Sequence, residues 1–265
     1  MENKINIKSN ECKRQYQFKN IDFLVSTYIN RKNLVIFFHG GRCGATLPIF
    51  RGYDYTFDDT NILSFSDPLL KYYNTNIGWY LNTTKHPSLR NDIISIINKI
   101  KDITQPSNLI FVAQCSGVLI AVELACIFNE YVFITNPHLI VKSDDCKVYD
   151  SWTDTRSFNI YNNTKYYPLE TILKENKESI ITYDDLDIRN AFINHGIPKH
   201  ITIYAHNDDY TTEWIVKVKE FYIKINKLDK CDIVLHKTNC KSPHHCPLPN
   251  NASLKEYLKL YISKL

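Results

Sequence analysis

The sequence predicts an α/β protein, in which a mostly parallel β-sheet lies between helices on both faces as a three-layer sandwich. Short apolar runs rich in β-branched and aromatic residues alternate with longer segments of helical periodicity, which is the pattern of a parallel sheet. The 265 residues, 44% of them hydrophobic, are enough for one core of this kind. The polar and aromatic stretch 140–198 interrupts the alternation. We therefore expect a single domain over 1–265, with 140–198 as a cap-like insertion of helices and loops above the sheet's carboxyl edge.

Each expected element follows from its local pattern. Strands are expected at 21–29, 33–38, 61–66, 109–113, 131–135, 200–205 and 231–236, and helices near 88–104, 117–128, 212–226 and 252–264. In the first of these helices Ile93, Ile97 and Ile100 share one face, and Pro106 follows its end. Residues 1–15 are polar, so they are expected to form a loosely held start of the chain.

Composition argues against two classes of partner. The net charge is +4, from 32 basic and 28 acidic residues, and no long basic run is present, so nucleic acid is not expected as a partner. No secretory signal precedes residue 15, and no apolar run approaches the ~20 residues of a membrane-spanning helix. The expected location is the cytoplasm, with reduced thiols.

The turn at 113–117 carries the strongest chemical signal. Its residues Ala113-Gln114-Cys115-Ser116-Gly117 join an apolar strand to an apolar helix, which is the layout of a G-x-S-x-G nucleophile elbow with Cys in the nucleophile's position. Such a turn requires small residues two before and two after the nucleophile. That requirement favours Cys115 as the nucleophile. If Ser116 were the nucleophile, positions 114 and 118 would have to be small, but they are Gln114 and Val118. Backbone N–H groups at the helix start would stabilise a developing anion.

Three further parts of such a site occur in the expected chain order. The strand at 33–38 ends in His39-Gly40-Gly41-Arg42, where Gly41 or Arg42 would supply an oxyanion-hole N–H together with Ser116. The strand at 200–205 is followed by Asp208 and Asp209; we favour Asp208 as the acid, and loop length leaves Asp209 open.

The predicted base lies in the loop before the last helix. This loop contains His244 and His245, and we favour His245 because a Gly-His pair is usual at this corner, with His244 in the glycine position. Cys240, His244, His245 and Cys246 could instead bind zinc, but their spacing matches no common zinc site, so no metal is expected. The prediction is a Cys115–His245–Asp208 triad that transfers an acyl group through a thioester.

Several short motifs resemble those of the α/β-hydrolase fold, and in particular of bacterial capsular-polysaccharide and glycan O-acetyltransferases of capsule and accessory secretion pathways. They are Leu47-Pro48-Ile49-Phe50-Arg51, Asn61-Ile62-Leu63-Ser64-Phe65-Ser66-Asp67-Pro68, Ile77-Gly78-Trp79-Tyr80-Leu81, Asn136-Pro137-His138 and His245-Cys246-Pro247. The resemblance covers roughly 30–140 and 200–262. It implies an α/β-hydrolase-like fold, acetyl-CoA as acyl donor with no bound cofactor, and a sugar hydroxyl of a glycan as acceptor.

The chain departs from that resemblance at the site itself. Ala113 replaces the first Gly of the elbow, Cys115 the nucleophilic Ser, Val118 the second Gly of a pair, and His138 the Gln expected after Asn136-Pro137. A Cys in the nucleophile's position occurs in active enzymes such as dienelactone hydrolases, and also where activity has been lost. The aromatic residues Trp79, Tyr80, Trp152 and Tyr166 are candidates for a sugar-stacking wall.

The expected function is therefore O-acetyl transfer, or ester hydrolysis, on a surface glycan or capsular polysaccharide. Two alternatives stay open. One is a catalytically impaired relative that acts as a binding or scaffold protein, peripheral to a glycan-assembly complex. The other is a Cys-dependent thioesterase or lactone hydrolase on the same fold.

Overall fold

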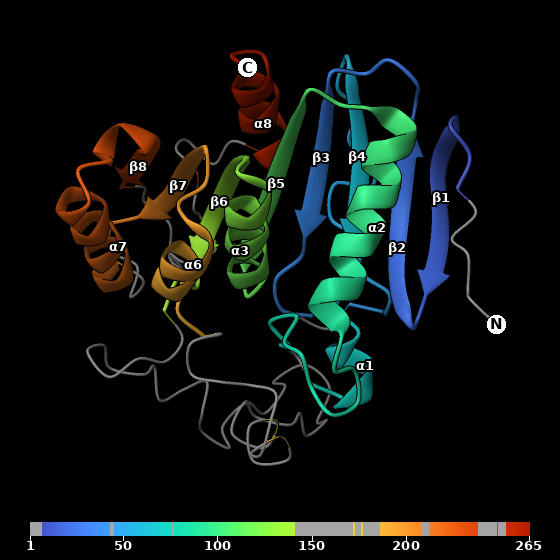
Figure 1. Cartoon of the computed structure of the whole chain (residues 1–265), viewed down its shortest axis with the longest axis horizontal. Coiled ribbons are helices and arrows are strands. Elements are labelled where there is room, and N and C mark those ends of the chain that lie inside the picture. Colours follow the sequence, from blue (N-terminus) through green and yellow to red (C-terminus); the bar gives the residue numbers. More distant parts are fainter. Residues whose placement is uncertain are drawn as a thin grey trace.

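A computed structural model describes residues 7–42, 45–75, 77–140, 172, 176, 186–207, 212–237, 248 and 253–265. One eight-stranded sheet with the order β1-β2-β4-β3-β5-β6-β7-β8 forms its centre (Figure 1). The strands are β1 Glu11–Phe18, β2 Ile21–Thr27, β3 Asn33–Phe38, β4 Thr60–Phe65, β5 Asn108–Cys115, β6 Tyr131–Pro137, β7 His200–His206 and β8 Cys231–His236. Strands β3 to β8 run parallel, whereas β1 and β2 are antiparallel to their neighbours.

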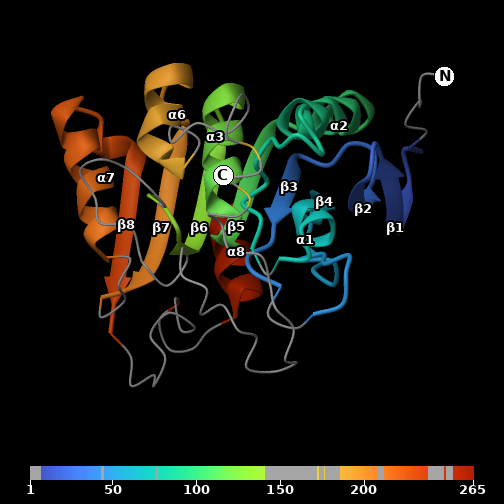
Figure 2. The ribbon, with the colours of Figure 1, turned by 90° about the horizontal axis from the view of Figure 1, so that it is seen from below.

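Helices cover both faces of the sheet, as the sequence predicts. They are α1 Leu69–Tyr72, α2 Leu89–Thr104, α3 Val118–Phe128, α6 Ile188–His195, α7 Thr212–Lys224, the 3-10 helix Leu228–Lys230 and α8 Leu254–Ile262. Seen from below in Figure 2, α2, α3, α6 and α7 lie on one side of the strands and α8 lies on the other. The predicted fold class is confirmed. Within the described residues, no helix is both long and apolar enough to cross a membrane.

The alternation of side chains along each strand produces two cores. On β3, Leu34, Ile36 and Phe38 point into the larger core under α2 and α3, whereas Val35 and Phe37 point into the smaller core under α8. All five are at most 1% exposed. Strands buried on both faces read as continuous apolar runs, which is why the sequence marks them clearly.

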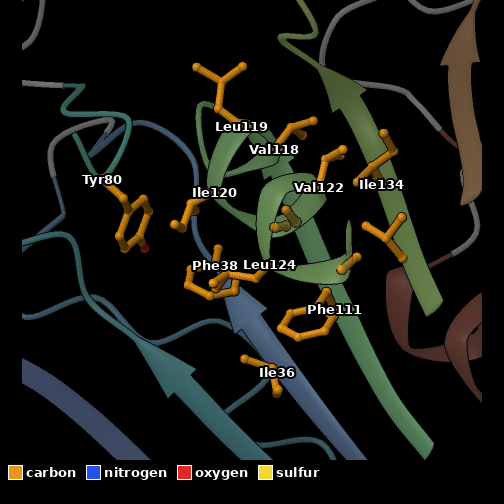
Figure 3. Packing of buried hydrophobic residues seen from close by; sticks show 14 of the residues in the cluster. Ile36, Phe38, Tyr80, Phe111, Val118, Leu119, Ile120, Val122, Leu124 and Ile134 are labelled. Carbon is orange, nitrogen blue, oxygen red and sulfur yellow. The ribbon is translucent and has the colours of Figure 1, made fainter. Parts of the chain in front are cut away.

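Helix α3 lies at the centre of the larger core. Its sequence, VLIAVELACIF, is apolar almost all round, which is typical of a buried helix. Figure 3 shows Val118, Ile120 and Leu124 of this helix over Phe38 of β3 and Phe111 of β5. Because α3 begins at Val118, three residues after Cys115, this packing fixes the end of β5 relative to β3.

The expectation for the start of the chain needs correction. The polar sequence of residues 1–15 predicts a loosely held start, but Glu11–Phe18 form β1, which pairs antiparallel with β2 at the edge of the sheet. Its exposed polar side chains give no apolar signal. Within the range expected for the insertion, 141–171, 173–175 and 177–185 lie outside the described residues, and α6 packs against α3 in the helical layer.

Candidate active site

The turn between β5 and α3 has the geometry of a nucleophile elbow. Cys115 has a φ of 52°, in the left-handed region that residues other than glycine rarely adopt. The Gly117 N–H donates to the Gln114 carbonyl at 3.1 Å, and α3 begins at Val118. The Cys115 side chain is partly exposed, whereas Ser116 is only 2% exposed. The strained backbone therefore presents the thiol and turns the neighbouring hydroxyl inward.

Two glycines make this turn possible because β3 ends beside it. A Cβ on Gly117 would lie 2.7 Å from the His39 carbonyl oxygen and 2.8 Å from that of Phe38. A Cβ on Gly40 would lie 2.7 Å from the Cβ of Cys115. The expectation that the position two after Cys115 must be small is confirmed. The reason is the close approach of the loop that follows β3 at 39–42, which we call the β3 loop.

The loop that contains the predicted oxyanion donors lies against Cys115. Gly41 and Arg42 are partly exposed, and the Arg42 Nε donates to the Ala45 carbonyl at 2.9 Å, within the same loop. The contact between Gly40 and Cys115 brings this loop to the thiol. The backbone N–H groups of Gly41, Arg42 and Ser116 remain the predicted donors to an oxyanion.

His39 anchors this loop, a role that the sequence did not reveal. Its Nδ1 donates to the Gly40 carbonyl, and its Nε2 accepts from the Asp67 N–H at 3.0 Å, so the bonding fits the neutral ring with its proton on Nδ1. Burial lowers the pKa of His39 to about 4, which agrees with a neutral ring. Because a trans peptide points its N–H away from its C=O, the bond to Gly40 fixes the direction of the Gly41 N–H.

The Asp67-Pro68 and Gly78-Trp79-Tyr80 motifs meet behind His39. The Asp67 carboxyl accepts from the Leu69 and Tyr80 N–H groups, both at 3.0 Å, and burial raises its pKa to about 7. A Cβ on Gly78 would lie 2.5 Å from Asp67 Oδ2, so this position also requires glycine. The Tyr80 hydroxyl donates to the Phe65 carbonyl at 3.1 Å and accepts from the His39 N–H at 3.2 Å.

This network also corrects the expectation of a sugar-stacking wall. Trp79 is 2% exposed and Tyr80 is fully buried, so neither ring faces a ligand. Trp152 and Tyr166, the other two aromatic candidates, lie outside the described residues. The paired glycine and acidic motifs therefore serve to hold the β3 loop in place.

A histidine outside the predicted triad contacts the thiol. The Cys115 Sγ lies 3.4 Å from His138 Nε2 and 3.9 Å from its Nδ1. His138 directly follows β6, is 1% exposed, and has its ring 5.9 Å from that of Trp214 on α7 in an edge-to-face arrangement. The sequence signals were its position after the strand at 131–135 and its place in the Asn136-Pro137-His138 motif.

The predicted acid and base lie outside the described residues, as do their alternatives: Asp208, Asp209, His244 and His245. Their flanking elements are described. Strand β7 ends at His206 before α7, and β8 ends at His236 in the same parallel set as β5. Cys240 and Cys246, considered as zinc ligands, are likewise outside. In the part of the chain that is described, no group of three or more His, Cys, Asp or Glu side chains could hold a metal ion.

Comparison with known proteins gives structural similarity without sequence similarity. No family model matches the chain. No curated protein sequence matches it. Among solved structures, the capsule O-acetyltransferase of Neisseria meningitidis serogroup A is similar with a TM-score of 0.62 and 16% identity, covering 94% of this chain and 93% of that one.

Two other similar structures are hydrolases. FphF, a fluorophosphonate-binding serine hydrolase of Staphylococcus aureus, has a TM-score of 0.58 and 11% identity, over 95% of this chain and 96% of that one. Esterase 2 of Thermogutta terrifontis has a TM-score of 0.57 and 13% identity, over 96% of this chain and 91% of that one. From this similarity, the strand order and the turn at Cys115, the chain has the α/β-hydrolase fold.

Proposed function

We propose that this protein is an acyl-transferring enzyme, an O-acetyltransferase of a surface glycan or capsular polysaccharide, with Cys115 as its nucleophile. The observation that carries the proposal is the strained backbone of Cys115, with φ 52°, at a turn against which the β3 loop packs. A strained residue at the junction of a strand and a helix is a costly arrangement that α/β hydrolases use to expose a nucleophile.

The proposed reaction follows from this placement. The Cys115 thiolate attacks the acyl carbonyl carbon, and N–H groups of Gly41 or Arg42 and Ser116 bind the resulting oxyanion. Collapse of this intermediate releases the donor's leaving group and leaves a thioester on Sγ. His245, oriented by Asp208, then removes the proton of a sugar hydroxyl as it attacks the thioester. Asp209 and His244 stay open as alternatives for these two roles.

The donor and acceptor are proposed from chemistry and from the similar proteins. One structure of the same fold is a capsule O-acetyltransferase, which supports a glycan hydroxyl as acceptor, and two others are hydrolases, which support ester chemistry. Acetyl-CoA is proposed as the donor because its thioester exchanges readily with a thiolate. We place this reaction in the cytoplasm, peripheral to a glycan-assembly complex.

Labelling of the thiol tests the proposal directly. The purified protein is treated near neutral pH with a thiol-reactive acyl probe, and the modified peptide is identified by mass spectrometry. Cys115 is expected to be acylated selectively, and Cys115→Ala to lose both labelling and turnover of acetyl-CoA. Cys12→Ala is the matched control because Cys12 is an exposed thiol on β1, so it is expected to leave both unchanged.

Turnover separates the remaining functions. Loss of acetyl-CoA only in the presence of a sugar acceptor indicates a transferase, and loss without an acceptor indicates an esterase or thioesterase. If Cys115 is not labelled selectively and Cys115→Ala leaves any activity intact, the catalytic proposal fails. The departures at Ala113, Cys115 and Val118 would then favour the non-catalytic binding or scaffold protein.

A further inference from the structure

We propose that His138 is a second imidazole of this site, which takes the proton of Cys115 and holds the thiolate as an ion pair. Cys115 would then ionise without the histidine of the last loop. The inference rests on the proposed role of Cys115 as nucleophile and goes beyond the predicted triad, which does not contain His138.

The short distance between the two side chains supports an ion pair. The Sγ lies 3.4 Å from Nε2 and 3.9 Å from Nδ1, so a thiolate would be in direct contact with the charged part of an imidazolium. The ring is 1% exposed and the thiol is partly exposed, so Cys115 is open to a substrate while His138 is shielded from water. Electrostatic attraction between a thiolate and an imidazolium is stronger in such a shielded place than in water.

The backbone holds the two residues in this relation. Strands β5 and β6 are parallel neighbours, and a register shift at their ends places Cys115 opposite Pro137. The His138 N–H donates to the Cys115 carbonyl at 3.4 Å, and Asn136 has a φ of 47°, which turns the chain at the end of β6. The edge-to-face contact with Trp214 limits rotation of the imidazole. The imidazole is thus placed by three elements: β5, β6 and α7.

Two of the four departures from the motifs that the chain resembles meet in this contact. The resemblance implies Ser at position 115 and Gln at position 138, where this chain has Cys115 and His138. A serine hydroxyl needs a base only as it attacks, whereas a thiol can be ionised beforehand by a neighbouring imidazole. The pairing of Cys with His therefore has a chemical reason that either change alone would lack.

Other titratable groups lie on the neighbouring elements. The elements around it carry His39 and Arg42 after β3, Asp67 after β4, His206 at the end of β7, Glu213 and Lys217 on α7, and His236 at the end of β8. The His39 ring bonds to the Gly40 carbonyl and the Asp67 N–H, and the Asp67 carboxyl accepts from the Leu69 and Tyr80 N–H groups. Asp208, Asp209, His244 and His245 lie outside the described residues, so the experiment must separate their effect from that of His138.

The proposed step is a single proton transfer. The S–H bond of Cys115 breaks, an N–H bond forms at His138 Nε2, and no other bond changes. The thiolate lies at the start of α3, where the helix dipole also favours a negative charge. His138 would thus prepare the nucleophile, which leaves His245 to act on the acceptor hydroxyl.

The rate of alkylation of Cys115 as a function of pH tests this step. Iodoacetamide reacts with the thiolate, and mass spectrometry of the peptide that contains Cys115 separates it from other cysteines. The midpoint for wild type is expected below the usual thiol value of about 8.5. His138→Gln is expected to raise this midpoint and to slow alkylation at pH 6.5 by about tenfold or more. His245→Gln is expected to raise the midpoint less than His138→Gln does. His195→Gln, at an exposed histidine on α6, is expected to leave the midpoint unchanged.

Three results would overturn the inference. They are an unchanged midpoint in His138→Gln, an equal upward shift in His245→Gln, and a wild-type midpoint at or above the usual value. The last needs no variant, so it applies even if His138→Gln does not fold; circular dichroism of His138→Gln and His138→Asn checks folding. A midpoint that depends on His138 without acetyl-CoA turnover would support the ion pair and contradict the proposed function.

Discussion

At the scale of single residues, close approach rather than backbone conformation requires glycine at position 117. Gly117 has a φ of −70°, which any residue can adopt, but a Cβ there would lie 2.7 Å from the His39 carbonyl oxygen. We predict that Gly117→Ala lowers the free energy of unfolding by about 1–3 kcal/mol through overpacking. It should also slow acylation of Cys115, because the turn and the β3 loop must move apart. Urea unfolding and labelling measure the two effects.

Gly196→Ala is the matched control for this change. Gly196 ends α6 with a φ of 82°, and a Cβ on it would meet no atom within 4 Å, so alanine there is strained by its backbone alone. The cost is expected to be similar, about 1–3 kcal/mol, with labelling of Cys115 unchanged. Equal labelling in the two variants would contradict a role for Gly117 in placing the thiol.

The buried His39 ring predicts a pH dependence of stability. The pKa of His39 is about 4 in the folded protein and about 6.5 in an unfolded chain, so between these values the unfolded chain binds more protons. The contribution of His39 to the free energy of unfolding should therefore be present above pH 6.5 and lost as the pH falls toward 4. The difference between wild type and His39→Gln, followed by urea unfolding at several pH values, should fall over this range.

Asp67 changes the free energy of unfolding with pH in the opposite direction to His39, and it is present in both wild type and His39→Gln. Its pKa is raised to about 7, so its contribution is lost as the pH rises toward 7. Taking the difference between wild type and His39→Gln removes this shared term. A difference that stays constant from about pH 4 to 6.5 would contradict a neutral, buried His39.

At the scale of elements, one buried ion pair joins α2 to α3. Arg90 Nη1 lies 2.8 Å from Glu123 Oε2, with side chains 8% and 18% exposed. Removing one partner leaves a charge with little water around it, so Arg90→Met or Glu123→Leu should each cost about 3 kcal/mol. The double variant should cost much less than the sum, as a double-mutant cycle by urea unfolding would measure.

An exposed ion pair is the comparison for this cycle. Lys230 Nζ lies 3.8 Å from Asp229 Oδ2, with side chains 46% and 70% exposed. Lys230→Met should cost less than about 1 kcal/mol because water replaces the lost partner. If Lys230→Met and Arg90→Met cost the same, the ion pair between α2 and α3 is not a source of stability.

The elements differ in how well the sequence predicts them, for physical reasons. The strand at 33–38 and the helix after Cys115 are buried on both sides, so their apolar runs predict them clearly. Strand β1 is partly exposed and polar, and pairing with β2 rather than its own residues decides its conformation.

The candidate site likewise has parts that the sequence predicts and parts that it does not. The turn at Cys115 is predictable because small residues lie at fixed spacing around it. The hydrogen bonds of His39 to Asp67 and Tyr80 join residues 28 and 41 positions apart, and the contact of His138 with Cys115 spans 23. Such contacts depend on strand order, which a single sequence does not display. The predicted Asp208 and His245 stay predictions.

At the scale of the whole molecule, the two faces of the sheet are covered unequally. Helices α2, α3, α6 and α7 share one face, while α8 packs on the other against Val35, Phe37, Ile62, Ile110, Val112 and Phe133 (Figure 2). Lys32 also donates to the Leu265 carbonyl at 2.9 Å, which ties the end of the chain to the start of β3. Within the described residues, the nine-residue α8 is the one helix over the second core, and Tyr55 and Phe57 of the loop before β4 also pack against this core.

The packing of α8 on this core predicts that substitutions of two of its leucines differ in their cost to stability. Leu258 is fully buried and Leu260 is 57% exposed. Leu258→Ala should lower the free energy of unfolding by about 2–5 kcal/mol, because it leaves a cavity against Phe37 and Phe133. Leu260→Ala should change it by less than about 0.5 kcal/mol, since the side chain is already in water. Urea unfolding of both variants measures the contrast. Equal effects would contradict a role for α8 in covering the buried Val35 and Phe37 of the second face.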